Sequence, residues 1–423
     1  MKHSNQPPFF SAGSSSGNSY IQVRASRRTI FNTLAALGAV ALLVAGAWWT
    51  ARTIFAKTAG SIGTQFSLAD GPWGKITAQP ILIEAPASII TADFRLGDSR
   101  WYFAARSATE VASFLRAAGV DEVATAKLVS LGREVDGKAG LWSVRPPEDI
   151  VRGLSPAVRS VLYDQLAAIP ENFAQVEPFR TTQLYLEKWL EAEKLPADLI
   201  TEVKSLIWKR GSGLFFSDYN LVADHISSPA LKIKLLAQLT QKASVVLTLH
   251  VPAGDSIDDL VAYYGVNGRA DKVRPILQGL SEAGGGMLGV SNMLPPFARS
   301  RLYRFPDALP GSDLGPACHW TSFNFFNQGA PDNSLHEVPA VQDVLGEKYR
   351  QVSGPPRFGD VVLLRLPDNS SIHSAVYIAD NIIFTKNGPS LATPYIFSTV
   401  EEMLAFYPNS ESIRLAYYRL KDS

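Results

Sequence analysis

The sequence predicts an α+β protein in which helices and antiparallel strands occupy separate stretches of the chain. Three observations predict this class. Apolar residues recur at helical spacing through residues 107–243. A strand, two helices and a second strand are expected in residues 244–306, and residues 307–423 combine a helix with an antiparallel meander. Before these stretches, residues 52–106 contain short apolar runs broken by Gly and Pro, which predicts strands or a linker.

Composition excludes several classes of protein. The chain has 423 residues, of which 46% are apolar and 19% charged, and 40 Lys and Arg oppose 39 Asp and Glu. This balance excludes wholesale disorder, and it argues against a nucleic-acid partner held by bulk positive charge. Cys318 is the single cysteine, which excludes an intramolecular disulfide and a cysteine-rich zinc site. The six histidines form no ligand pair, so we expect no metal and no cofactor.

The N-terminal part predicts a membrane protein. Residues 1–28 are rich in Ser, Asn, Gly and Pro, which predicts a disordered cytoplasmic tail. Residues 29–51 contain the uncharged run IFNTLAALGAVALLVAGAWW at 30–49. About twenty apolar residues in a helix match the hydrocarbon core of a bilayer. Arginines gather before this run, so the positive-inside rule places the rest of the chain outside the cytoplasm.

Two alternatives remain for the apolar run. Arg27-Arg28 before it resembles a twin-arginine export signal, although Trp48 and Trp49 fit poorly beside a cleavage site. A buried core helix is the other alternative, but no partner helix is expected beside it. An uncleaved anchor and an export signal agree on location. We expect a single-pass protein of the inner or cytoplasmic membrane, with its bulk periplasmic or extracytoplasmic.

Residues 107–243 predict a helical accessory domain. Ser107 and Glu110 have the spacing of a capping box, and Ser155-Pro156 is typical of a second helix start. No group of residues in this stretch suggests catalysis. His225 is interpreted as a structural or surface residue.

Residues 244–306 predict a small βααβ unit. The run SVVLTLHV is typical of a strand, Gly254 opens the turn before a helix that ends near Gly265, and RSRLYRF is expected to be the second strand. This order resembles a LysM module, which implies a glycan ligand from peptidoglycan. Gly284 and its neighbours add a loop that the family lacks. The alternative is a small unit that braces the following domain.

The predicted chemistry lies in residues 307–423. Pro316 favours the start of a helix, which places Cys318 near a helix N-terminus. Free N–H groups there favour a thiolate and lower its pKa. The alternative is a small buried cysteine.

A three-stranded meander is expected after this helix. Asp360 organises the turn before the strand VVLLRL, and His373 begins the next strand. A third strand follows a tight turn and carries Thr385 and Asn387, which share one face because they are two residues apart. A histidine on a strand beside a helix-borne cysteine is the arrangement that a thiolate–imidazolium pair requires.

This order resembles the papain-like NlpC-type cell-wall peptidases and the related CHAP amidases over the last 110 residues or so. The resemblance implies that Cys318 attacks a carbonyl and that His373 acts as general base and then acid. Relatives usually have Asp-Cys-Ser-Gly, whereas this chain has Ala-Cys-His-Trp at 317–320, which is closer to CHAP domains. This departure leaves the substrate open.

The resemblance also suggests supporting residues. The family spacing leads to Thr385 as the group behind the imidazole, but we prefer Asn387 because its amide oxygen can accept from the ring N–H. Tyr303 is the candidate for a second oxyanion donor beside the Cys318 N–H, or else a packing residue. His319 and Trp320 are expected to line the cleft.

The leading hypothesis is a membrane-anchored, extracytoplasmic cysteine hydrolase that cleaves amide bonds of cell-wall peptide. Its partners would be peptidoglycan peptide or glycan and, through residues 30–49, the membrane. One alternative is an inactive papain-like binding or scaffold protein of the envelope. The other is a papain-like acyltransferase that keeps the same catalytic pair.

Overall fold

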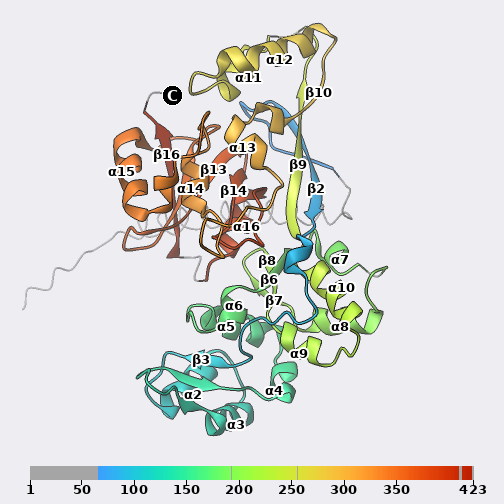
Figure 1. Cartoon of the computed structure of the whole chain (residues 1–423), viewed down its shortest axis with the longest axis vertical. Helices are drawn as coiled ribbons and strands as arrows, with labels where there is room; N and C mark the ends of the chain where they lie inside the picture. The colour runs from blue at the N-terminus through green and yellow to red at the C-terminus, as the bar shows by residue number, and fades with distance from the viewer. Residues whose placement is uncertain (1–64, 192, 255, 409–411, 422–423) are drawn as a thin grey trace, which may run out of the picture. The chain divides into compact units, whose positions relative to one another are not determined.

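The chain has an α+β fold with antiparallel sheets, as the sequence predicts (Figure 1). The computed structural model describes residues 65–191, 193–254, 256–408 and 412–421. Within this described part, no helix is both long and apolar enough to cross a bilayer. The tail and the apolar segment predicted for residues 1–51 lie outside the described residues.

Two long strands connect the first described residues to the middle of the chain. Strand β2 (Lys75–Ile83) pairs along its whole length with β9 (Lys242–Val251) in antiparallel register, so that Lys75 faces His250 and Ile83 faces Lys242 (Figure 1). Alternate residues of both strands are apolar and buried, which is the period-two pattern of a strand with one covered face. Strands β1 (Phe66–Ser67) and β10 (Gly286–Gly289) complete this sheet at its two edges.

The region from 107 to 243 is less purely helical than the sequence predicts. Ser107 and Ser155 cap helices as expected, through hydrogen bonds to the backbone N–H groups of Glu110 and Val158. Strands of two to four residues also form two three-stranded sheets, and such runs are too short to show a two-residue period. The helices are α2 (Ala108–Ala117), α3 (Glu122–Leu131), α4 (Glu148–Gly153), α5 (Pro156–Leu166), α6 (Phe173–Val176), α7 (Leu186–Trp189), α8 (Ala197–Ser205), α9 (Tyr219–Asp224) and α10 (Pro229–Leu239). The strands are β3 (Trp101–Phe103), β4 (Arg133–Glu134), β5 (Trp142–Val144), β6 (Phe179–Thr182), β7 (Trp208–Arg210) and β8 (Gly213–Phe216).

The predicted order of strand, helix, helix and strand is present after residue 242, but the closing strand was misplaced. Strand β9 leads into α11 (Asp258–Tyr264) and α12 (Ala270–Glu282), and β10 then returns to pair with β9. The segment RSRLYRF, expected to be the closing strand, instead begins inside α13 (Pro296–Arg301). Pro296 occupies the first turn of α13, where its missing N–H costs nothing.

The C-terminal region is a six-stranded antiparallel sheet with a helix on each face. Its strand order is β11-β16-β12-β13-β14-β15, and β12 to β14 form the predicted meander. The strands are β11 (Tyr349–Val352), β12 (Val361–Arg365), β13 (Ser371–Ala379), β14 (Ile382–Thr385), β15 (Ile396–Thr399) and β16 (Arg414–Leu420). The helices are α14 (Cys318–Phe323), α15 (Val338–Lys348) and α16 (Val400–Ala405).

The two faces of this sheet have separate cores. On one face, Trp320 and Phe323 of α14 share an apolar cluster with Leu363 and Val376. On the other face, Met403 of α16 shares a cluster with strand residues Val362, Leu364, Ala375 and Tyr377. Because successive strand residues point to opposite faces, this division assigns a face to each polar residue of β13 and β14.

Candidate functional site

Cys318 is the first residue of α14, as the sequence predicts, and only 7% of it is exposed. Burial raises the pKa of its thiol. The backbone N–H groups of Ser374, His319 and Cys318 itself act in the opposite direction, because each favours a negative sulfur. The Ser374 N–H has the largest effect of the three, so the sulfur lies beside strand β13.

The reason for this position is a gap in the sheet. The backbone of Tyr377 faces the β12 side, because its N–H donates to the carbonyl of Asp360 and its C=O accepts from the N–H of Gly359. Backbone direction alternates along a strand, so Ser374 directs its N–H to the β14 side. Strand β14 has already ended at Thr385 at this level. The Ser374 N–H on this side favours a negative Cys318 sulfur, one residue along the strand from His373.

His373 lies on the face of the sheet that α16 covers, since it pairs with Leu364. Its ring is fully buried, and Nε2 is 2.9 Å from the hydroxyl oxygen of Thr385. Nδ1 is buried too and has no hydrogen-bond partner among the described residues. The expected hydrogen bond between His373 and Cys318 is therefore not made in this conformation, although the N–H of Ser374, the next residue of β13, acts on the Cys318 sulfur.

The environment keeps this pair uncharged. Burial, followed by the charges of His319 and Arg180, lowers the pKa of His373 to about 3. Burial also raises the pKa of the Cys318 thiol, and both shifts oppose transfer of the thiol proton to the imidazole. At neutral pH the proton therefore stays on sulfur in this conformation. The Tyr407 ring covers the imidazole at a centroid distance of 5.6 Å, and its pKa is raised by burial and by Cys318. A thiolate–imidazolium pair would need this cover to open.

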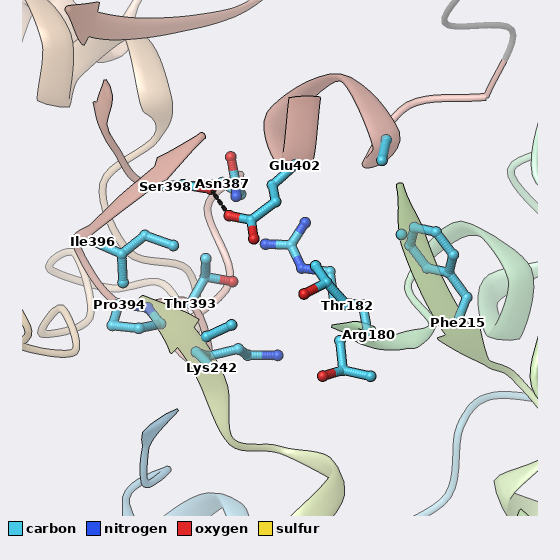
Figure 2. A pocket seen from close by; sticks show the side chains of 14 residues that line it. Arg180, Thr182, Phe215, Lys242, Asn387, Thr393, Pro394, Ile396, Ser398 and Glu402 are labelled. Carbon is cyan, nitrogen blue, oxygen red and sulfur yellow. Dashed lines mark hydrogen bonds between the residues drawn. The ribbon is translucent and has the colours of Figure 1, made fainter. Parts of the chain in front are cut away.

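Thr385, rather than the preferred Asn387, stands behind the imidazole. Strand β14 ends at Thr385, so the two-residue spacing that put both side chains on one face does not bring them to the same place. Asn387 is 4% exposed and instead lines a cavity, together with Arg180, Lys242 and Glu402 (Figure 2). Its Oδ1 has no hydrogen-bond partner within the described part of the chain.

Other residues predicted for the site have structural contacts. The Tyr303 hydroxyl donates to the carbonyl of Val245 at 2.7 Å and its ring packs on Phe397, so it is a packing residue of β9 and β15. Trp320 is buried in the core, only 4% exposed, and its ring stacks on His336 with the ring centroids 5.3 Å apart.

The two remaining predictions concern His319 and Asp360. His319 is half-buried, and its Nδ1 lies 2.9 Å from the Ser374 hydroxyl on the α14 face. Asp360 organises its turn as predicted, since it accepts from the N–H of Arg357, and it also binds Arg419 through both carboxylate oxygens.

Sequence reasoning missed two residues of the site. Lys386 is fully buried and donates to the carbonyls of Gly388 and Ser390. Burial lowers the pKa of its ammonium group to about 8, and the nearby Cys318 thiol acts in the opposite direction. Tyr407 comes from a segment that follows α16 and has no recognisable spacing to the other residues. The signal available for Lys386 was its position next to Thr385 in a segment predicted as an apolar strand, because a lysine is rarely fully buried without a partner.

Comparison with known proteins adds no assignment. No family model matches the chain, and no curated protein or solved structure matches it.

Proposed function

We propose that the C-terminal region is a cysteine acyl-transfer enzyme that hydrolyses amide bonds, with Cys318 as nucleophile and His373 as general base. The observation that carries this proposal is the state of the His373 ring. One nitrogen is held by Thr385, and the other is buried without a partner one residue from the amide that contacts the Cys318 sulfur. An unpaired buried nitrogen costs free energy, and catalysis is one of the few reasons for keeping it.

Each group has a definite role in the proposed reaction. With Nε2–H donating to Thr385, Nδ1 is the basic nitrogen that would take the thiol proton. The sulfur then attacks the carbonyl carbon of the amide, and the backbone N–H of Cys318 stabilises the oxyanion. His373 returns its proton to the leaving amine, and water hydrolyses the thioester to release the acid.

The proposed substrate is cell-wall peptide. Support comes from the resemblance of the helix, Gly-Asp strand, His strand and hairpin to NlpC-type peptidases, and from the helix-then-meander order of α14 and β12 to β14. The uncharged segment at residues 30–49 fits this proposal, because an anchored enzyme would meet its substrate outside the membrane.

Digestion of purified peptidoglycan tests the proposal. Wild-type chain should release new amine and carboxyl ends, detected by mass spectrometry, whereas Cys318→Ala and His373→Ala should release none above background. His250→Ala is the matched control, since His250 bonds to Thr77 on another sheet and should leave the product yield unchanged. Equal digestion by wild type and Cys318→Ala would end the proposal. Products joined to an added amine would identify a transferase instead.

One observation favours a second function, that of an inactive scaffold. Both Cys318 and His373 are buried and the pair is uncharged in this conformation. For a scaffold, Cys318 should resist active-site thiol reagents under all conditions that keep the chain folded. Labelling of folded protein in the presence of peptidoglycan fragments would instead favour the enzyme, because substrate would have opened the cover.

A further inference from the structure

A cavity on the α16 side of the C-terminal sheet is lined by charged groups from three elements. Arg180 comes from β6, Lys242 from the start of β9 and Glu402 from α16, and the cavity has an empty volume of about 540 Å³, open solvent at its mouth included (Figure 2). It lies beside Thr385, because its lining residue Ile396 pairs with Thr385 across β14 and β15. None of the proposed reaction steps uses it.

The two cations of this cavity have no acceptor of their own. Neither the Arg180 guanidinium nor the Lys242 ammonium makes a side-chain hydrogen bond or an ion pair with any described residue. Arg180 instead lies over the Phe406 ring, with its central carbon 4.2 Å from the ring centroid. Burial lowers the pKa of both groups, that of Lys242 to about 8, which shows how poorly their charges are compensated.

The nearby carboxylates of Glu402 and Glu177 do not pair with the charges of Arg180 and Lys242. Glu402 already accepts from the Ser398 hydroxyl at 2.8 Å (Figure 2). It also accepts from the Thr399 N–H at 3.2 Å. Glu177 acts on both cations through space, but it forms no ion pair with either of them within the described residues, and burial raises its pKa. A guanidinium and an ammonium carry several N–H donors each, and those of Arg180 and Lys242 have no acceptor among the described residues.

A second observation points to a ligand. The side chain of Asn387 lines the same cavity, the residue is only 4% exposed, and its Oδ1 has no hydrogen-bond partner within the described residues. A buried amide oxygen with no partner is costly, and it marks an amide whose surroundings the protein alone does not satisfy. Turning the amide over exchanges this oxygen for the N–H₂ group, which can then donate to an anion in the cavity.

We propose that this cavity binds a small anion, a carboxylate or phosphate group, held by Arg180, Lys242 and Asn387. Guanidinium and ammonium groups form the strongest hydrogen bonds to such oxygens, and a site of low dielectric strengthens them further. The anion would also adjoin the segment that covers the proposed catalytic pair, since Phe406 under Arg180 precedes Tyr407 over His373. Binding does not depend on the proposed hydrolysis, and it can be tested apart from it.

Thermal unfolding of the full-length chain tests the site with two probes, inorganic phosphate and acetate, at ionic strength held constant with chloride. A ligand that binds only the folded state raises Tm in a saturable way. In wild type, at least one probe should do so. Lys242→Gln removes a charge-assisted contact, and Asn387→Asp places a like charge beside the anion. Each substitution should raise the probe concentration that gives half of the maximal Tm increase by about tenfold or more.

Lys209→Gln is the matched control, because Lys209 is an exposed cation on β7, a strand of the same small sheet as β6, and it should behave as wild type. A response to phosphate alone would assign phosphorylated ligands, and a response to acetate alone would assign carboxylates. The proposal is overturned if neither probe raises Tm above the chloride control, or if Lys242→Gln and Asn387→Asp, both folded, keep the wild-type midpoint.

Discussion

The His373 ring is held at Nε2 by the Thr385 hydroxyl, 2.9 Å away, while its buried Nδ1 has no partner among the residues that the structure describes. In one of its two neutral tautomers, the ring donates from Nε2 to this hydroxyl. A hydroxyl that accepts from Nε2–H leaves Nδ1 as the basic nitrogen, and Nδ1 is the atom that a neighbouring thiol would protonate. The proposed enzyme therefore uses a threonine where we had preferred the amide of Asn387.

The first prediction concerns this hydroxyl. Thr385→Val keeps the shape of the side chain but removes the partner of Nε2, so the buried ring loses its fixed tautomer and orientation. We expect kcat for peptidoglycan digestion to fall by about tenfold to a hundredfold. Thr385→Ser restores the hydroxyl and should recover most of the rate. Equal rates for Thr385→Val and wild type would show that Thr385 does not position the base.

The second prediction concerns the cover over the pair. Tyr407→Ala removes the ring that lies 5.6 Å from His373, so opening the site should cost less free energy. We expect alkylation of Cys318 by iodoacetamide at pH 8 to become about tenfold faster, equivalent to about 1.4 kcal/mol. Tyr417→Ala is the control, since Tyr417 packs on Tyr377 and not on the imidazole. The idea of a cover fails if both variants react at the wild-type rate.

The third prediction concerns pH. The pKa of His373 is lowered to about 3 by burial, against about 6.5 in an unfolded chain. Between these values the unfolded state binds the extra proton, so stability decreases as the pH falls from about 6.5 toward 3. We expect the loss of Tm between pH 7 and pH 5 to be smaller in His373→Gln than in wild type. An identical pH dependence in both proteins would contradict a neutral, buried His373.

The fourth prediction concerns the turn before β12. Asp360 and Arg419 form a bidentate ion pair, and their side chains are only 2% and 13% exposed. The shorter contact, between Arg419 Nη2 and Asp360 Oδ2, is 2.6 Å. Asp360→Ala leaves the guanidinium without its partner and frees the Arg357 N–H, so we expect a loss of about 3 kcal/mol in the free energy of unfolding. Denaturant unfolding measures it. Glu122→Ala breaks an exposed pair with Arg116 and should have little effect, and a similarly small effect for Asp360→Ala would refute the argument.

Much of the C-terminal region could be predicted from local signals. Pro316 and the aromatic spacing predicted the helix that begins at Cys318, and the Gly359-Asp360 turn with the apolar runs after it predicted the strands around His373. These signals are local, because capping, turn chemistry and a two-residue period depend on neighbours along the chain. The short strands of the middle region lacked such a period and were interpreted as helical.

The partner of His373 could not be chosen in the same way. The family spacing indicates Thr385 and the chemistry of the amide favours Asn387, and only the end of β14 at Thr385 decides between them. Tyr303 also looked suitable by position, but its hydroxyl is taken by the Val245 carbonyl from a strand far away in the sequence. Contacts of this kind depend on which surfaces meet, and a single sequence carries no direct sign of them.

The sequence by itself determined the α+β class, the helix start at Cys318, the strand that begins near His373 and the turn organised by Asp360, because each follows from short-range geometry. The tertiary structure alone decided that the Cys318 sulfur lies near the Ser374 N–H, that Tyr407 covers His373, and that Arg180, Lys242 and Asn387 line one cavity. These residues lie far apart along the chain, and only packing brings them together. The protonation of the site has the same origin, because the pKa values of Cys318 and His373 are moved chiefly by burial.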